Sequence, residues 1–133
     1  MKFLIIVFTS LLVSSCVTKK NLVSETYDTK ILGTWAEYTD SENNIMVYAT
    51  YFPDGRYHTY GYFPDENQTY FFADGHWSIN GGISCIAVKY ESTNTYKPGD
   101  IVCNRIIKID SSEYIFDSNG DHITMNRISS GKL

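Results

Sequence analysis

The sequence predicts an all-β domain, a small antiparallel up-and-down β-barrel of eight or nine strands behind an N-terminal signal peptide. Strand-length runs rich in β-branched and aromatic residues alternate with turn signals, and no amphipathic helix period appears after Lys30. The 133 residues include 11 Tyr, 7 Phe and 2 Trp, and aromatic rings favour a pleated, half-buried surface. This length accommodates one domain and excludes a multidomain enzyme.

Residues 1–15 read as a secretory signal peptide. Lys2 supplies one positive charge, and a mainly apolar run follows over residues 3–13. The run is shorter than the roughly 20 apolar residues that a membrane-spanning helix needs. We therefore expect a leader that is removed on export.

The end of the leader, Val13-Ser14-Ser15-Cys16, resembles the lipobox of bacterial lipoproteins. The resemblance implies cleavage before Cys16, a diacylglycerol on its thiol and an acyl group, such as palmitate, on its new amine. Several acyl chains hold a protein far more firmly on a membrane than one chain does. Val17 after the cysteine favours the outer membrane, with the domain in the periplasm or at the cell surface. The alternative is an ordinary signal peptide cleaved at another small residue.

Residues 16–30 are expected to be the lipidated cysteine and a polar tether, and residues 31–133 the barrel domain. Part of the tether, around Leu22 and Tyr27, could instead form a short helical turn that caps the domain. Turn signals containing Gly or Pro divide the rest of the chain. The predicted strands are residues 31–38, 45–52, 56–63, 69–73, 76–79, 83–90, 101–109, 113–116 and 122–128.

A barrel is favoured over a two-sheet sandwich, because consecutive hairpins suit a meander and closure removes exposed strand edges. Gly33-Thr34-Trp35 on the first strand and Arg127 on the last resemble the lipocalin and fatty-acid-binding superfamily. Phe52-Pro53-Asp54-Gly55-Arg56-Tyr57 and Asp74-Gly75-His76-Trp77-Ser78-Ile79 look like hairpins of small bacterial lipocalin-like domains.

The resemblance implies that Gly33, Trp35 and Arg127 form the barrel floor, where the Trp plugs the closed end and the Arg packs across it. The two-residue period agrees, because it places Arg127 on one face with Ile123 and Met125. Stacking on the indole would satisfy the guanidinium through a cation–π contact. The alternative is an Arg that extends into water.

Lipidation of Cys16 would leave an even pair, Cys85 and Cys103, in an oxidising compartment. They lie on consecutive predicted strands, and one antiparallel register places them opposite each other, with 86 facing 102 and 87 facing 101. We expect a cross-strand disulfide. The alternative is two buried, inert thiols.

An aromatic band over residues 48–77 is the most suggestive feature for binding. Because rings fall on both faces of these strands, one set would line the interior, and the outer set would form an exposed patch for a partner. The alternative is that rings simply fill the barrel. The candidate ligand-binding residues are Tyr48, Tyr57, Tyr60, Tyr62, Phe72 and Trp77.

Other functions find little support. A net charge of −4 argues against nucleic acid. His58, His76 and His122 fall on separate segments without the close ligand spacing of a metal site. No Gly-X-Ser-X-Gly elbow occurs, and we expect no enzyme activity, no metal and no cofactor.

The sequence therefore predicts a membrane-anchored, lipocalin-like binding module for a small amphiphilic or aromatic ligand. The alternative is a structural or inhibitory envelope lipoprotein that binds a partner protein through exposed aromatic residues and loops. Interior volume separates the two hypotheses, since about 300 Å³ or more is typical of a ligand site.

Overall fold

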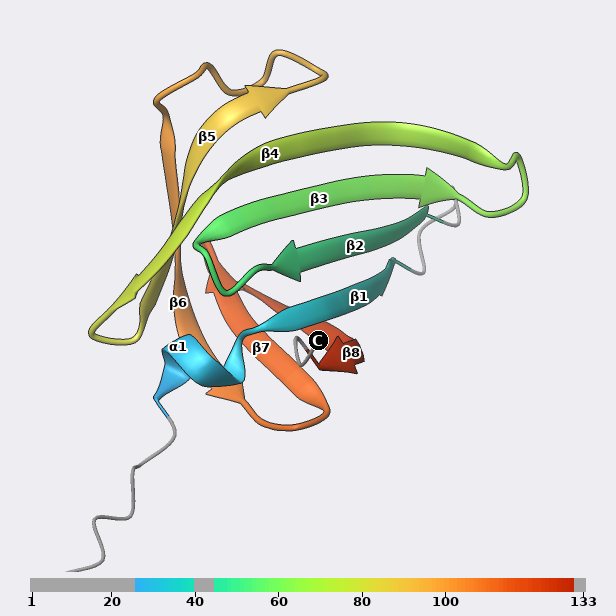
Figure 1. Ribbon diagram of the computed structural model, residues 1–133. Helices are drawn as coiled ribbons and strands as arrows, with labels where there is room; N and C mark the ends of the chain where they lie inside the picture. The colour runs from blue at the N-terminus through green and yellow to red at the C-terminus, as the bar shows by residue number, and fades with distance from the viewer. Residues whose placement is uncertain (1–25, 40–44, 131–133) are drawn as a thin grey trace, which may run out of the picture.

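The computed structural model of the protein describes residues 26–39 and 45–130, which form a closed antiparallel β-barrel (Figure 1). The predicted up-and-down barrel is confirmed, with eight strands in sequence order and the first strand paired with the last. The leader, Cys16 and most of the tether lie outside the described residues. The elements are α1 (Tyr27–Lys30), β1 (Gly33–Thr39), β2 (Ile45–Tyr51), β3 (Arg56–Phe63), β4 (Gln68–Asn80), β5 (Ile83–Glu91), β6 (Ile101–Ile109), β7 (Glu113–Ser118) and β8 (Asp121–Ser130).

The meander gives the barrel two different ends. Connections β3–β4, β5–β6 and β7–β8 lie at one end, called here the open end, and connections β2–β3, β4–β5 and β6–β7 lie at the closed end with α1. Figure 1 shows α1 beside the β4–β5 turn, where the Tyr27 ring comes within 4.0 Å of the position a Cβ on Gly82 would take. Within the described ranges no helix has the length and hydropathy of a membrane span.

The prediction of two short strands around an Asp74-Gly75 turn is wrong. Residues 68–80 form the single strand β4, and the pairing with β5 shifts register between Asp74 and Gly75, which leaves Lys89 of β5 as the extra residue of a bulge. A Cβ at Gly75 would lie 2.4 Å from the Ala87 carbonyl oxygen. Only glycine at position 75 lets the β4 and β5 backbones approach this closely. The Asp-Gly pair, which is typical of turns, here marks a β-bulge.

The hydrophobic core fills the closed-end half of the barrel. Trp35 is fully buried and packs edge-on against Tyr114, with ring centroids 5.8 Å apart. Tyr51 in turn contacts Tyr57, Trp77 and Tyr114 edge-on. Such aromatic pairs contribute about 0.5–1.5 kcal/mol each beyond the area they bury. We call this cluster the aromatic floor: Trp35, Tyr51, Tyr57, Trp77, Tyr114 and Phe116.

Arg127 of β8 closes the floor from below. Its Cζ lies 4.0 Å from the Trp35 ring centroid, so the stacked arrangement is the one present. Its Nη1 donates to the Leu32 carbonyl at 2.6 Å and its Nη2 donates to the Lys30 carbonyl, while Trp35 Nε1 donates to the Ile31 carbonyl at 2.7 Å. One guanidinium and one indole thus fix three successive carbonyls of the segment that enters the barrel.

Gly33 sits where that segment becomes β1. Its φ of 114° lies in the left-handed region that favours glycine. Two residues further on, the β1–β8 pairing shifts register so that Trp35 faces Arg127. The Gly-X-Trp spacing therefore combines a turn into the barrel with the residue that plugs it.

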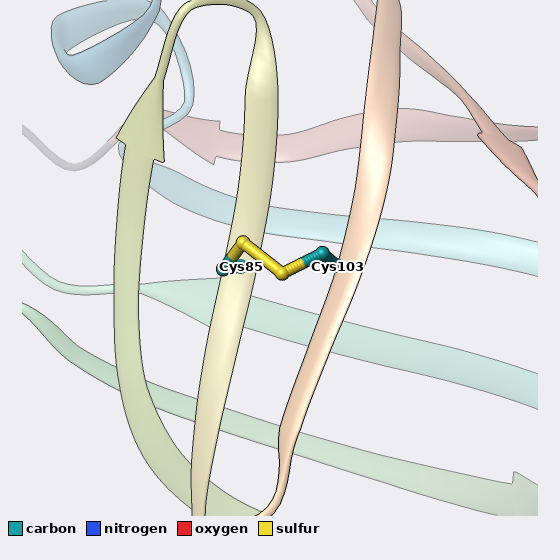
Figure 2. Close-up of a disulfide and its surroundings, with 2 residues drawn as sticks. All are labelled: Cys85 and Cys103. Atoms are coloured by element: carbon teal, nitrogen blue, oxygen red, sulfur yellow. A yellow bond between two sulfur atoms is a disulfide. The ribbon is translucent and has the colours of Figure 1, made fainter.

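The predicted disulfide is confirmed. Cys85 and Cys103 pair across β5 and β6 with Sγ atoms 2.10 Å apart, as Figure 2 shows. The neighbouring pairs, Ile86 with Val102 and Ala87 with Ile101, match the expected register. Because the inner positions of these strands alternate with the cysteines, the bridge lies on the outer surface of the barrel.

We predict that replacing both cysteines with serine lowers the free energy of unfolding by roughly 3 kcal/mol, because the bridge closes a loop of 18 residues in the unfolded chain. Urea unfolding of the oxidised protein and of the double variant measures the difference. Labelling of two thiols in the unreduced protein by an alkylating reagent would contradict the disulfide itself.

Arg127→Met is expected to lower the free energy of unfolding by about 2–3 kcal/mol, since it leaves two carbonyls without their charged donor. Arg127→Lys should not restore it, because an ammonium lacks the planar fork that reaches both carbonyls. The matched control is Arg105→Met, whose exposed pair with Asp117 should matter far less. Equal losses for the two Met variants would contradict this role.

Candidate ligand-binding cavity

The open-end half of the barrel encloses a cavity of about 520 Å³. Its volume exceeds the value that separates a ligand site from a filled interior. We call it the inner cavity. Its lining residues are Glu37, Val47, Ala49, Tyr51, Tyr57, Thr59, Tyr70, Phe71, Ala73, Ser84, Ile86, Val88, Glu91, Thr93, Thr95, Tyr96, Val102, Asn104, Phe116 and Met125.

The cavity exists because small side chains follow Trp35 in one inner row, on β2 to β4. Strand pairing places Trp35 beside Ala49, Ala49 beside Thr59 and Thr59 beside Ala73, which puts these residues level across β1 to β4. The row below it carries the large rings of Tyr51 and Tyr57. Large rings therefore fill the closed end, and two alanines and a threonine leave space directly above them.

The bottom of the cavity is formed by the phenols of the aromatic floor. The Tyr51 and Tyr114 rings pack edge-on with centroids 6.3 Å apart, and Thr59 and Ser84 line the cavity beside the floor. Burial raises the pKa of Tyr57 to about 12 and that of Tyr51 well above its usual range. These phenols stay protonated at physiological pH, so the bottom of the cavity is uncharged.

The mouth is built from the start of β4 and the β5–β6 connection. The Phe71 ring lies across Gly61, where an added Cβ would be 2.4 Å from its Cε1 atom. On the other side, the Glu91 carboxylate accepts hydrogen bonds from the Thr93 hydroxyl and from the Thr93, Thr95 and Tyr96 backbone amides. These bonds, that of the hydroxyl foremost, hold the pKa of Glu91 below its usual range. The rim is thus ordered by its own hydrogen bonds.

Glu37 is the one charged residue in the wall below the rim, among the lining residues that the structure describes. It is half-buried, and desolvation raises the pKa of its carboxyl. Its cross-strand neighbour is Val47, another lining residue. The carboxylate therefore faces a mainly apolar space.

Of the six candidate ligand-binding residues, the structure places only Tyr57 in the cavity lining. Trp77 lies in the aromatic floor, where its Nε1 donates to the Phe52 carbonyl at 2.9 Å. The other four alternate with lining residues along β2, β3 and β4, and so they point outward. The ligand role of this set stays a prediction, and the four outward residues are Tyr48, Tyr60, Tyr62 and Phe72.

The outward rings form a strip on the barrel surface. Tyr48 stacks on Tyr60 at 5.0 Å, Tyr60 pairs with Phe72 across β3 and β4, and Phe72 lies 5.4 Å from Tyr90. We call these four residues the outer aromatic strip. Phe72 and Tyr90 are both exposed, which is typical of surfaces that contact other molecules.

Two of the three histidines, His58 and His76, line one groove, and His122 is not part of it. His58 Nδ1 lies 2.7 Å from Asp74 Oδ1 on the outer surface, in a groove that also includes His76. In the part of the chain that the structure describes, no cluster of three or more His, Cys, Asp or Glu side chains could hold a metal ion.

Several lining residues were missed by sequence reasoning. Glu37 could have been found, because the two-residue period places it on the same face as Trp35. Tyr70 and Phe71 could not, since the β3–β4 pairing shifts register between Gly61 and Tyr62 and leaves Tyr70 as an extra residue. Tyr96 lies in a connection whose path no periodicity describes.

No family model matches this chain, and no curated protein matches it. Solved structures do. A lipocalin-like protein from Bacteroides uniformis is 15% identical with a TM-score of 0.54, covering 74% of this chain and 99% of its own. A second Bacteroides uniformis protein, solved by NMR, is 13% identical with a TM-score of 0.55, covering 77% and 92%. An uncharacterized protein from Bacteroides eggerthii is 10% identical with a TM-score of 0.51, covering 73% and 98%. At these identities the likeness shows the fold alone, and that fold is the lipocalin-like β-barrel.

Proposed function

We propose that the protein is a membrane-anchored, lipocalin-like lipoprotein that binds a small amphiphilic or aromatic ligand and carries out no catalysis. The inner cavity of about 520 Å³ is the observation that carries the proposal. Its exposed wall surface is mainly apolar, with polar side chains distributed among the apolar ones, which is the usual character of a small-molecule site. In this proposal the domain lies in the periplasm or at the cell surface, attached to the outer membrane.

The shape of the cavity supports an amphiphile. Ala49, Ile86 and Met125 offer apolar contact in its depth, while Glu91, Thr93 and Thr95 lie at the mouth. An apolar tail would be buried deep inside, and a polar head would remain near water. Each buried methylene contributes about 0.8 kcal/mol.

The second candidate function, a lipoprotein that docks on an envelope protein, is favoured by the outer aromatic strip. Its exposed rings lie on the opposite face of the wall from the cavity lining. Aromatic residues are enriched in protein interfaces. Ala73 and Phe72 are neighbours on β4 that face the cavity and the strip respectively, and they separate the two candidates.

We expect saturable one-to-one binding of octan-1-ol by the full chain in phosphatidylcholine nanodiscs, measured by calorimetry against empty nanodiscs. Ala73→Trp should weaken it at least tenfold, because the indole fills the space above the aromatic floor. Phe72→Ala is the matched control and should leave the affinity unchanged. Absence of saturable binding, or equal affinity for Ala73→Trp and the unsubstituted chain, would contradict a ligand site.

Cys16→Ser is expected to block processing or to move the protein from the membrane fraction to the soluble fraction, since no thiol would remain for the lipid. Fractionation followed by intact mass measurement reports both effects. The double variant Cys85→Ser with Cys103→Ser is the control and should stay lipidated. A Cys16→Ser protein that matures normally and remains with the membranes would refute the anchor.

A further inference from the structure

Glu37 is the starting point, because an acidic side chain in an apolar wall needs a partner. No hydrogen bond or ion pair to it occurs among the described residues. The other carboxylate of the lining, on Glu91, is already engaged by three backbone amides of the rim. Glu37 therefore keeps its acceptor capacity for something inside the cavity.

The surroundings of Glu37 suit a positive charge. Strand pairing places Glu37, Val47, Gly61 and Phe71 level across β1 to β4. Because Gly61 has no side chain, the Phe71 ring leans over it toward the β1 side of the cavity. A group at this height meets a carboxylate and an aromatic ring, and both attract cations.

The cavity offers no positive charge to pair with an anion. The described residues that line it include no Lys, Arg or His. Burial keeps the floor phenols protonated, so they are uncharged. An anionic head group would lose its water without gaining a counter-ion, and it would face Glu37.

We infer that the inner cavity selects ligands with a positively charged amine head group, which pairs with Glu37 while the apolar tail extends down to the aromatic floor. This inference rests on the proposed ligand-binding function and specifies its ligand class. The Phe71 ring covers the ammonium group on the side away from the carboxylate. The inner face of β1 to β4 thus supplies the whole recognition unit.

Three probes with the same tail test the inference: octylammonium, octan-1-ol and octanoate. We measure their affinities by calorimetry at pH 7 on the full chain in phosphatidylcholine nanodiscs, with empty nanodiscs as the blank. Octylammonium should bind about tenfold more tightly than octan-1-ol, the effect of one charge-assisted hydrogen bond. Octanoate should bind more weakly than octan-1-ol.

Glu37→Gln keeps the shape of the side chain and should abolish the preference, so that octylammonium and octan-1-ol bind with equal affinity. The barrel should tolerate it, since a half-buried charge is removed. Asp28→Asn, on exposed α1 at the closed end, changes the net charge equally and should keep the preference. These two variants separate local pairing from general electrostatic attraction.

Two results overturn the inference while the ligand-binding function stands: equal affinity for octylammonium and octan-1-ol, or a preference that survives in Glu37→Gln. A preference lost equally in Asp28→Asn also overturns it. If none of the three probes binds, the proposed function itself fails, and this inference fails with it.

Discussion

The contact between Arg127 and Trp35 is the constraint on which the rest of this barrel depends. The Arg127 guanidinium stacks on one face of the Trp35 ring and so joins the last strand to the first. The same guanidinium donates hydrogen bonds to the Lys30 and Leu32 carbonyls of the segment that enters the barrel. A barrel of eight strands has no free edge only while its first and last strands stay paired. The stacked pair lies at that closure, at the end where the core is densest, and so it couples closure to core packing.

The closed end and the open end of the barrel differ in how densely their side chains pack. Large rings pack against one another at the floor, and one row higher the side chains shrink to alanine and threonine. Hydrophobic burial is therefore concentrated in one half of the barrel. The other half is less densely packed and contains the inner cavity.

Local patterns predicted the fold well. Gly33-Thr34-Trp35, the recurring turn residues and the cysteine spacing each act within a few residues or across one hairpin. The site was harder to predict, because which face of a strand points inward changes wherever a bulge inserts an extra residue. Tyr57 lies next to a regular turn, and it was named as a ligand-binding candidate from the sequence and lies in the cavity lining. Tyr70 and Phe71 lie at a register shift, and the sequence did not predict them as lining residues. The Asp74-Gly75 pair was wrongly predicted to form a turn, because glycine is typical of both turns and bulges and here it marks a bulge.

The length of β4 also shapes the route into the molecule. With 13 residues it is about twice as long as β7, which has 6. Figure 1 shows the β3–β4 hairpin projecting well beyond its neighbours. The wall of the barrel is consequently tall on one side and low on the other, so that the rim slants. The opening of the barrel is therefore asymmetric, with its highest wall at the β3–β4 hairpin.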